Sequence, residues 1–258
     1  MPARISGPIV ITGASSGLGS ALARHYAGHG ATVSLIARRA DALEQLGREF
    51  PGHCAIQAVD VRDAKAMQQA AGVFCSQYGP PEIVIANAGI SVGTLTERPE
   101  DTQVFRDVID TNVIGLVNTF QPFIAAMRQR GSGILVGIAS VAGYRGLPGA
   151  GAYAASKAAA ISYLEGLRVE LRGSGIAVIT ICPGYIDTAM TSRNPYWMPF
   201  MMTAETAAEK IAGIIRRRKT YAVIPWQMAI VARLMHVLPR CIYDPLSSKF
   251  GYKPRRNS

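Results

Sequence analysis

The sequence lacks the features that mark several special classes of protein. It has no apolar run near the ~20 residues of a membrane-spanning helix, and no apolar stretch near Met1 long enough for a secretory signal. Internal repeats and low-complexity tracts are also missing. Hydrophobic residues make up 49% of the 258 residues, enough for a large core, which excludes disordered, collagen-like and coiled-coil chains. We expect a cytoplasmic protein.

Cysteine is scarce, and its spacing argues against cysteine-based sites. The four cysteines stand at positions 54, 75, 182 and 241, and no Cys-x-x-Cys pair occurs. Disulfide frameworks and structural zinc sites depend on paired or closely spaced cysteines. We therefore predict reduced thiols and no metal site.

Acidic residues are few, and the excess of positive charge is placed unevenly. The chain has 27 Lys and Arg against 17 Asp and Glu, a net charge of +10. Residues 214–258 hold ten of these bases and one acid, Asp244, so the rest of the chain is almost neutral. Nucleic-acid binding needs basic residues on a recognisable reading element. Since no such element is present, we predict no nucleic-acid partner.

Short runs rich in Val and Ile alternate with longer segments of helical period. Several runs are apolar on both faces, which is typical of parallel strands covered by helices on both sides. The candidate strands are Ile9–Thr12, Thr32–Ala37, Ala55–Asp60, Ile83–Asn87, Ile134–Ser140, Ala177–Cys182 and Tyr221–Ile224. The candidate helices are 17–29, 40–49, 63–78, 102–129, 152–172 and 204–218. This alternation predicts an α/β fold: a single doubly wound Rossmann-type domain with a seven-stranded parallel sheet and helices on both faces.

A glycine-rich turn follows the first predicted strand and opens the first helix. It reads Thr12-Gly-Ala-Ser-Ser-Gly-Leu-Gly19, a G-x3-G-x-G spacing rather than the commoner G-x-G-x-x-G. Glycines let the backbone approach a diphosphate, and a helix start offers free N–H groups. The alternative is an ordinary strand-to-helix turn. We predict that the dinucleotide contacts of this turn are Gly13, Ser15, Ser16, Gly17, Leu18 and Gly19.

The end of the second predicted strand indicates which dinucleotide is used. A carboxylate there would accept a hydrogen bond from the ribose 2′-OH of NAD, whereas arginine suits a 2′-phosphate. Here the strand runs directly into Arg38 and Arg39, and the first acid is Asp41 on the next helix. We predict NADP (NADPH), with NAD as the weaker alternative. Arg38 is the main expected contact, and Ser15 is a further donor to the same phosphate.

A phenol and an amine four residues apart suggest acid–base chemistry. Tyr153 and Lys157 would share one helix face, and a nearby cation lowers the pKa of a phenol from its usual ~10. We expect Lys157 and an oxidised nicotinamide together to lower the pKa of Tyr153. Ser140, at the end of the fifth predicted strand, is a candidate donor to a substrate oxygen. Asn112 interrupts an otherwise apolar helix. It either bridges backbone groups or binds a water for proton relay.

These motifs together resemble the short-chain dehydrogenase/reductase family, over about residues 8–225. The matching elements are T-G-x-x-x-G-x-G at 12–19, Asp60-Val61, Asn87-Ala88-Gly89, Asn112, Ser140, Tyr153-x3-Lys157 and Pro183-Gly184. One departure is Ala86, where many members carry Asn. The resemblance implies a catalytic tetrad of Asn112, Ser140, Tyr153 and Lys157, and a homodimer or homotetramer. It also implies cofactor contacts from Asp60, Val61, Asn87, Ala88, Gly89, Tyr153, Lys157, Pro183, Gly184, Ile186 and Thr188.

The substrate side is expected in a variable loop at about residues 185–203. This loop carries the apolar cluster Tyr196, Trp197, Met198, Phe200, Met201 and Met202, which suits either a bulky apolar substrate or an ordinary packed lid. Apart from Arg193, no arginine in the loop stands out as a residue that would bind a carboxylate. We therefore favour an apolar carbonyl or alcohol over a small acid as substrate. The predicted substrate contacts are Ser140, Tyr144, Tyr185 and Trp197.

The chain divides into a catalytic domain, residues 1–225, and a basic C-terminal helix and tail, residues 226–258. The segment Trp226–Leu238 is apolar, has basic neighbours and is too short to cross a bilayer. It is expected to pack on the protein or on another subunit, or to lie peripherally in an anionic membrane surface. His236 within it is interpreted as a packing residue.

The sequence therefore predicts an NADP(H)-dependent oxidoreductase that transfers a hydride between nicotinamide and a carbonyl or alcohol carbon, with Tyr153 as general acid or base. Three alternatives remain open. They are an NADP-sensing binding protein with little catalysis, an NAD-dependent alcohol dehydrogenase of the same family, and an enzyme recruited by its basic tail to membranes or an acidic carrier protein.

Overall fold

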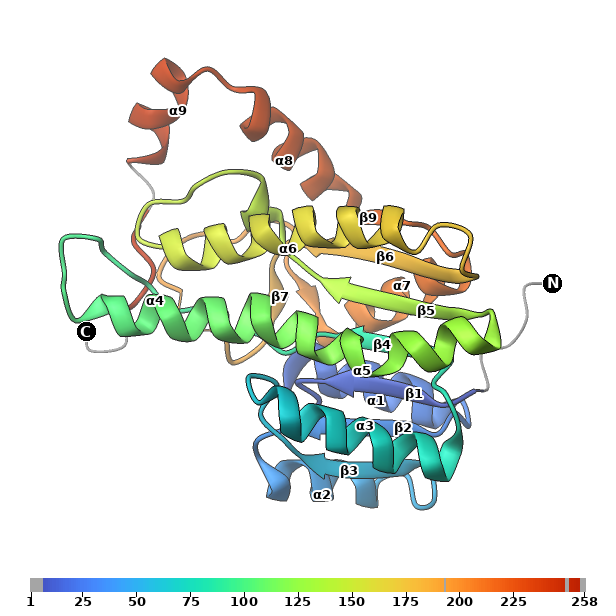
Figure 1. The fold of residues 1–258 in the computed structure, drawn as a ribbon. Helices are drawn as coiled ribbons and strands as arrows, with labels where there is room; N and C mark the ends of the chain where they lie inside the picture. Colours follow the sequence, from blue (N-terminus) through green and yellow to red (C-terminus); the bar gives the residue numbers. More distant parts are fainter. Residues whose placement is uncertain (1–6, 193, 249–250, 256–258) are drawn as a thin grey trace.

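One parallel sheet organises the chain. The computed structural model describes residues 7–192, 194–248 and 251–255. Within them, seven strands pair in parallel in the order β3-β2-β1-β4-β5-β6-β9 (Figure 1). The strands are β1 Ile9–Thr12, β2 Val33–Ala37, β3 Cys54–Ala58, β4 Ile83–Ala86, β5 Gly133–Ile138, β6 Ile176–Pro183 and β9 Tyr221–Ile224. The predicted α/β fold and seven-stranded sheet are confirmed, with strand ends displaced by no more than two residues.

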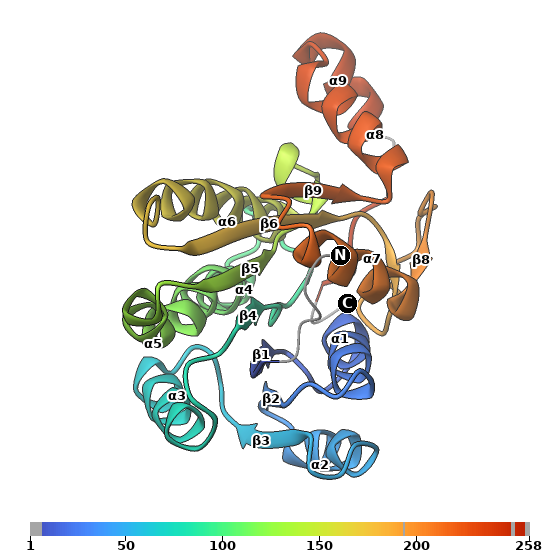
Figure 2. The ribbon, with the colours of Figure 1, turned by 90° about the vertical axis from the view of Figure 1, so that its right-hand side faces the viewer.

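Helices cover both faces of the sheet because successive apolar residues of each strand point to opposite sides. In β1, Ile9 and Ile11 join a core that includes side chains of α1, α2 and α7, whereas Val10 joins a second core with α3, α5 and α6. Figure 2 shows these two layers on either side of the strands. The helices are α1 Gly17–Gly28, α2 Ala40–Arg48, α3 Ala64–Tyr78, α5 Gly115–Arg130, α6 Gly151–Glu170 and α7 Ala204–Arg216.

The helix predicted over residues 102–129 is not one regular helix. It consists of α4 Asp101–Ile109, a π-helical turn at Asp110–Ile114, and α5. A π turn shifts the hydrogen-bonding register by one residue and is frequent at functional sites. Here it contains the predicted site residue Asn112.

Several short elements were not predicted. The paired strands β7 (Ile186–Asp187) and β8 (Met202–Thr203) bound the predicted substrate loop, and a 3-10 turn covers Val141–Tyr144. A further helix, α9, spans Arg240–Ser247. Two-residue strands are too short to show a period of two, and α9 has only eight residues, one of them proline.

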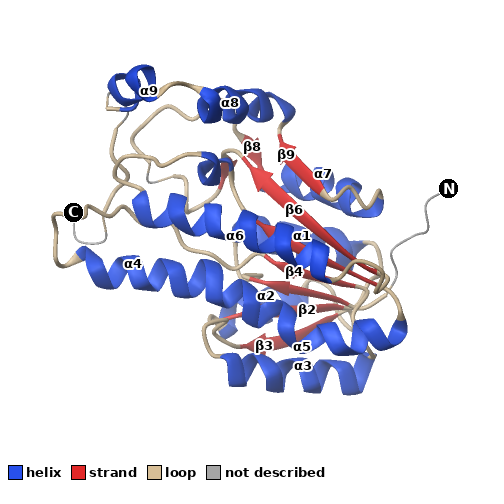
Figure 3. Cartoon of the chain, turned by 45° about the horizontal axis from the view of Figure 1, so that its top comes forward, coloured by secondary structure: helices blue, strands red, loops and turns tan. Residues whose placement is uncertain are grey.

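The helix predicted at 226–238 is α8, Trp226–Val237. Together, α8 and α9 project from the β9 edge of the sheet (Figures 1 and 3). Arg145 joins them to the loop after β5: its Nη1 donates to the Leu238 carbonyl at 2.6 Å, and its guanidinium lies 3.9 Å from the centroid of the Tyr243 ring. His236 Nδ1 is 2.9 Å from the Tyr144 carbonyl oxygen. Among the described helices, none has the length and hydropathy to cross a membrane.

Candidate active site

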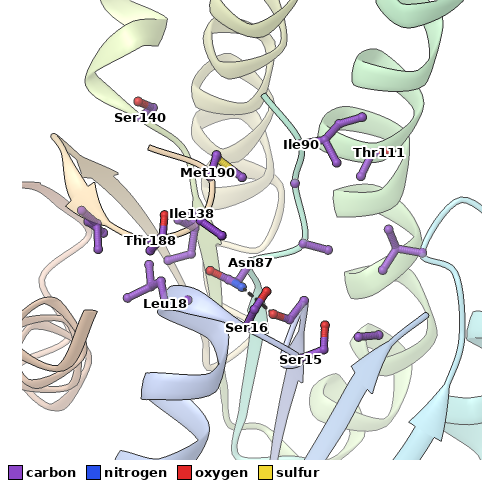
Figure 4. Close-up of a pocket in the computed structure, with 18 of the residues that line it drawn as sticks. Ser15, Ser16, Leu18, Asn87, Ile90, Thr111, Ile138, Ser140, Thr188 and Met190 are labelled. Carbon is purple, nitrogen blue, oxygen red and sulfur yellow. Dashed lines mark hydrogen bonds between the residues drawn. The ribbon is translucent and has the colours of Figure 1, made fainter. Parts of the chain in front are cut away.

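A cavity of about 490 Å³ opens where the strands end at their carboxyl side. Figure 4 shows Ser15 and Ser16 at the start of α1, Asn87 near the centre, and Ser140 at the far end. Every residue predicted to contact the dinucleotide lines this cavity except Gly19, and Ser140 lines it too. Residues from six separate strand ends thus meet at one site, as expected for a doubly wound sheet.

The glycines of the turn after β1 let other groups approach its backbone closely. Gly13 (φ +68°) and Gly17 (φ +56°) have left-handed backbones that favour glycine. Gly19 does not line the cavity, but a Cβ there would collide with the Gly13 carbonyl oxygen and approach Asn87 Nδ2 to 2.6 Å. Asn87 Nδ2 in turn donates to the Thr12 carbonyl at 3.0 Å. Gly19 is therefore required by packing beneath the turn.

Basic side chains gather at one end of the cavity. Arg38 and Arg39 both line it, and Arg39 Nη2 donates to the carbonyl and the hydroxyl of Ser15, each at 3.1 Å. Asp60 pairs with Arg62 (Nη2 to Oδ2 2.7 Å), and this hydrogen bond, together with the charges of Arg62 and Arg38, lowers the pKa of Asp60. This end of the cavity can therefore hold an anionic group.

Tyr153 and Lys157 lie on the same face of α6. Lys157 Nζ is 5.9 Å from the centroid of the Tyr153 ring and donates to the Ile138 carbonyl at 2.8 Å. Burial raises the pKa of Tyr153, although a hydrogen bond with Ser140 opposes the shift, and burial lowers the pKa of Lys157 to about 8. The lowered pKa expected for Tyr153 depends on Lys157 and an oxidised nicotinamide together. With the charge of Lys157 alone, the cost of burying the phenolate is larger.

Ser140 is held at the end of the cavity by its local backbone. β5 ends at Ile138, two residues earlier than predicted, and Ser140 caps the following 3-10 turn by accepting a hydrogen bond from the Ala142 N–H at 3.1 Å. Its side chain is buried, and its hydroxyl donates to the Pro183 carbonyl at 3.5 Å. Ser140 and Tyr153 both line the cavity, so a substrate oxygen bound there can meet both hydroxyls.

Asn112 lies behind the cavity and braces it. Its Oδ1 accepts from the Ile90 N–H at 2.8 Å, and its Nδ2 donates to the Ile90 carbonyl at 3.0 Å and to Ser156 Oγ at 2.9 Å. Of the two alternatives that the sequence left open, this geometry matches the bridging one. The side chain ties the segment after β4 to α6, and both amide hydrogens are used in doing so.

The predicted substrate contacts are dispersed. Trp197 is 83% exposed and does not line the cavity, so we do not retain it as a contact. The Tyr144 hydroxyl is 2.7 Å from that of Tyr221, also outside the cavity. Tyr185 does not line the cavity either, and its ring meets that of Tyr196 edge-on with the ring centroids 6.5 Å apart. Arg193 falls outside the described residues.

Comparisons with known proteins agree on one family. The model of the short chain dehydrogenase family matches residues 8–198. An uncharacterized oxidoreductase of Myxococcus xanthus is 37% identical over 238 residues, covering 91% of this chain and 94% of that protein.

Two solved structures show the same fold. A short chain dehydrogenase/reductase from Burkholderia phymatum in complex with NAD has a TM-score of 0.82 at 25% identity, covering 91% of this chain and 94% of that one. An alcohol dehydrogenase from Thermococcus sibiricus complexed with 5-hydroxy-NADP has a TM-score of 0.75 at 24% identity, covering 85% and 96%. From the family match, the related sequence and the geometry of the cavity, this chain belongs to the short-chain dehydrogenase family of oxidoreductases.

Proposed function

We propose that the protein is an NADPH-dependent reductase of carbonyl compounds, with Tyr153 as the proton donor. The observation that carries this proposal is that Ser140 and Tyr153 both line one dinucleotide-sized cavity, with Lys157 on the same face of α6 as Tyr153. A polarised oxygen bound between these two hydroxyls would receive a hydrogen bond from one and a proton from the other.

The cavity suits a nicotinamide dinucleotide. The glycine turn leaves the start of α1 open for a diphosphate, and side chains at Gly13 or Gly17 would enter this space or strain the backbone. Related structures carry NAD in one case and an NADP derivative in another. Our preference for NADP rests on this chain's own Arg38 and Arg39, since a 2′-phosphate would bind two guanidinium groups and the Ser15 hydroxyl.

Tyr153, Ser140 and Lys157 have different roles in the proposed reduction. The bound cofactor would supply the hydride. The Tyr153 hydroxyl donates a proton to the carbonyl oxygen, Ser140 orients that oxygen, and Lys157 contributes positive charge beside the phenolate that results. Because burial raises the pKa of Tyr153, its hydroxyl stays protonated at neutral pH. A protonated Tyr153 is the form that reduction requires, because it must give a proton to the carbonyl oxygen.

Removal of the Tyr153 hydroxyl tests this assignment. Tyr153→Phe should lower kcat/KM for carbonyl reduction by at least about 10²-fold, because general acid catalysis typically contributes this much. The dissociation constant of NADPH should stay within a few-fold, since the ring remains. Tyr78→Phe, at the end of α3 and outside the cavity lining, removes a phenol hydroxyl elsewhere and serves as the control. Unchanged turnover by Tyr153→Phe would rule out its role.

A further inference from the structure

The last described residues, Gly251–Arg255, return to the catalytic domain and pass beside the active site. We call this segment the C-terminal strap. The Gly93 N–H donates to the Pro254 carbonyl at 2.9 Å, which joins the strap to the segment after β4. A Cβ at Gly149 would collide with the Tyr252 ring, so the strap also packs closely against the turn before α6. The strap therefore contacts both the segment after β4 and the turn before α6, the helix that carries Tyr153.

A two-point ion pair fixes the end of the strap. Arg255 Nε and Nη2 donate to the two carboxylate oxygens of Asp101 at 2.8 and 3.0 Å, and Nη2 also reaches Glu100 at 2.8 Å. Asp101 is buried at the start of α4 and accepts a further hydrogen bond from the Leu95 N–H. Bidentate Arg–carboxylate pairs define orientation as well as distance. The position of the strap is thus determined by specific contacts.

The strap brings one cation to the catalytic tyrosine. Lys253 Nζ lies 5.4 Å from the centroid of the Tyr153 ring. The side chain is half-buried, and within the described residues it forms no hydrogen bond or ion pair with an acidic group. Burial lowers its pKa to about 8. Removing a cation from water without a counter-ion is unfavourable, and such groups are typical of binding sites.

We propose that Lys253 binds a carboxylate of the substrate beside Tyr153. The proposal rests on the reductase function above and defines its substrate class as carbonyl compounds that carry a carboxylate. Lys253 approaches Tyr153 from outside the cavity lining, and the cations that do line the cavity have different positions. Arg38 and Arg39 lie at the nucleotide end, and Lys157 donates to the Ile138 carbonyl. The sequence favoured an apolar substrate because only Arg193 in the loop suggested acid binding; Lys253, 50 residues beyond that loop, changes this expectation.

Matched acids and esters test the proposal in full-length enzyme. The substrates are 2-oxo and 3-oxo acids of four to eight carbons and their methyl esters, assayed by NADPH absorbance. The wild type should prefer acids at least tenfold in kcat/KM, since a hydrogen bond to a charged group contributes this much. Lys253→Met should remove the preference, mainly through KM, and Lys253→Arg should retain part of it. Lys65→Met, which removes an exposed lysine of α3, should change nothing.

Equal loss on acids and esters in Lys253→Met, or no preference for acids in the wild type, would overturn the proposal. A binding measurement separates this result from a failure of the reductase assignment. Hexanoate should bind the NADPH-saturated wild type at least tenfold more tightly than hexanamide, and the two should bind alike in Lys253→Met. Hexanoate binding no tighter than hexanamide refutes the carboxylate site. Hexanoate binding through Lys253 without any carbonyl reduction refutes the reductase function alone.

A second, independent observation concerns the outer surface of the C-terminal helices. Six large apolar side chains are each at least 50% exposed there, and we call them the α8–α9 face: Trp226, Ile230, Leu234, Val237, Ile242 and Leu246. Their spacing places them along one side of each helix, opposite the buried Met228 and Ala232 of α8. Single exposed apolar residues are common, but a contiguous set marks an interaction site.

Cations outnumber acids around this face. The two helices carry Arg233 and Arg240 against one acidic residue, Asp244. Trp226 also lines a second cavity, of about 570 Å³. The described lining of this cavity contains three cations and no acidic side chain; the cations are Lys210, Arg217 and Lys219. Two copies of such a surface would repel each other, whereas an anionic surface would attract it.

We infer that the α8–α9 face docks on an anionic phospholipid bilayer. Apolar side chains with flanking cations are the pattern of helices that lie in a membrane interface. Full-length protein should sediment with vesicles containing phosphatidylglycerol and at least tenfold less with pure phosphatidylcholine. Ile230→Glu with Leu234→Glu should abolish sedimentation, whereas Val73→Glu on α3 and Val169→Glu on α6, which alter equally exposed valines elsewhere, should not.

Absence of wild-type sedimentation with anionic vesicles would overturn the inference, and so would unaltered sedimentation of the double variant. Size-exclusion chromatography of the same proteins identifies the competing occupant. If the double variant converts a wild-type dimer to a monomer and the wild type does not bind lipid, the face is a contact between subunits. Thermal unfolding of each variant checks that the fold is intact.

Discussion

Replacement of Gly19 by alanine tests whether the turn beneath the cofactor site is packed as closely as the structure shows. The new Cβ would collide with the Gly13 carbonyl oxygen and come within 2.6 Å of Asn87 Nδ2. Neither atom is the far end of a flexible side chain, because Asn87 is held by its hydrogen bond to the Thr12 carbonyl. The turn itself must therefore shift.

Two opposing contributions determine how much Gly19→Ala changes the free energy of unfolding. Overpacking costs about 1–3 kcal/mol, whereas Gly→Ala in a helix contributes up to about 1 kcal/mol in favour of folding. A net loss of about 1–2 kcal/mol should lower Tm by roughly 2–8 °C in a domain of this size. Displacement of Gly13 and Asn87 should also weaken NADPH binding at least tenfold, since both line the cavity.

Gly72→Ala is the matched control. Gly72 also lies inside a helix, α3, and a Cβ there would have no neighbour within 4 Å. This variant should be as stable as the wild type or slightly more stable, with unchanged NADPH affinity. Calorimetry and fluorescence titration of NADPH measure both quantities. If Gly19→Ala matches Gly72→Ala in Tm and affinity, the close approach of α1 to the turn is incorrect.

Two further predictions concern charge in the cavity. Arg38→Gln should reduce kcat/KM for NADPH about tenfold and leave NADH nearly unchanged, since it removes a charge-assisted hydrogen bond to the 2′-phosphate; equal effects on both cofactors, or an equal effect of Arg48→Gln on α2, would contradict this role. Lys157, with a pKa of about 8, is charged below that pH and neutral above it, so the dissociation constant of NADPH should rise as pH increases past about 8. Lys157→Met should bind more weakly and lose this inflection, and persistence of the inflection would assign it to another group such as Lys253.

The sequence predicted correctly those features that depend on residues close together in the chain. The central strands β1, β2, β4 and β5 follow from apolar runs that are buried along their whole length, and the glycine turn follows from its position between a strand and a helix. Tyr153 and Lys157 share a face because four residues make about one helical turn. All of these relations lie within a few residues of sequence.

Features that depend on distant contacts had no such signal. Nothing near Lys253 in the sequence indicates that it lies against Tyr153, 100 residues earlier, and a basic residue near a chain end looks solvated. The burial of Tyr153 had no local signal for a related reason: the spacing to Lys157 is visible in the sequence, but the packing that raises the pKa of the phenol is not. Trp197 looked like a lid residue by its apolar character, yet its ring faces solvent.

The strap has a consequence for proteolysis of the protein. The sheet is complete once β9 ends at Ile224, whereas the ammonium beside Tyr153 belongs to Lys253, on a segment that the ion pair between Arg255 and Asp101 fixes. Proteolytic cleavage after α9 would leave every strand of the sheet on one fragment and Lys253 on the other. A nicked preparation should therefore still bind NADPH, and its choice of substrate should differ from that of the intact protein.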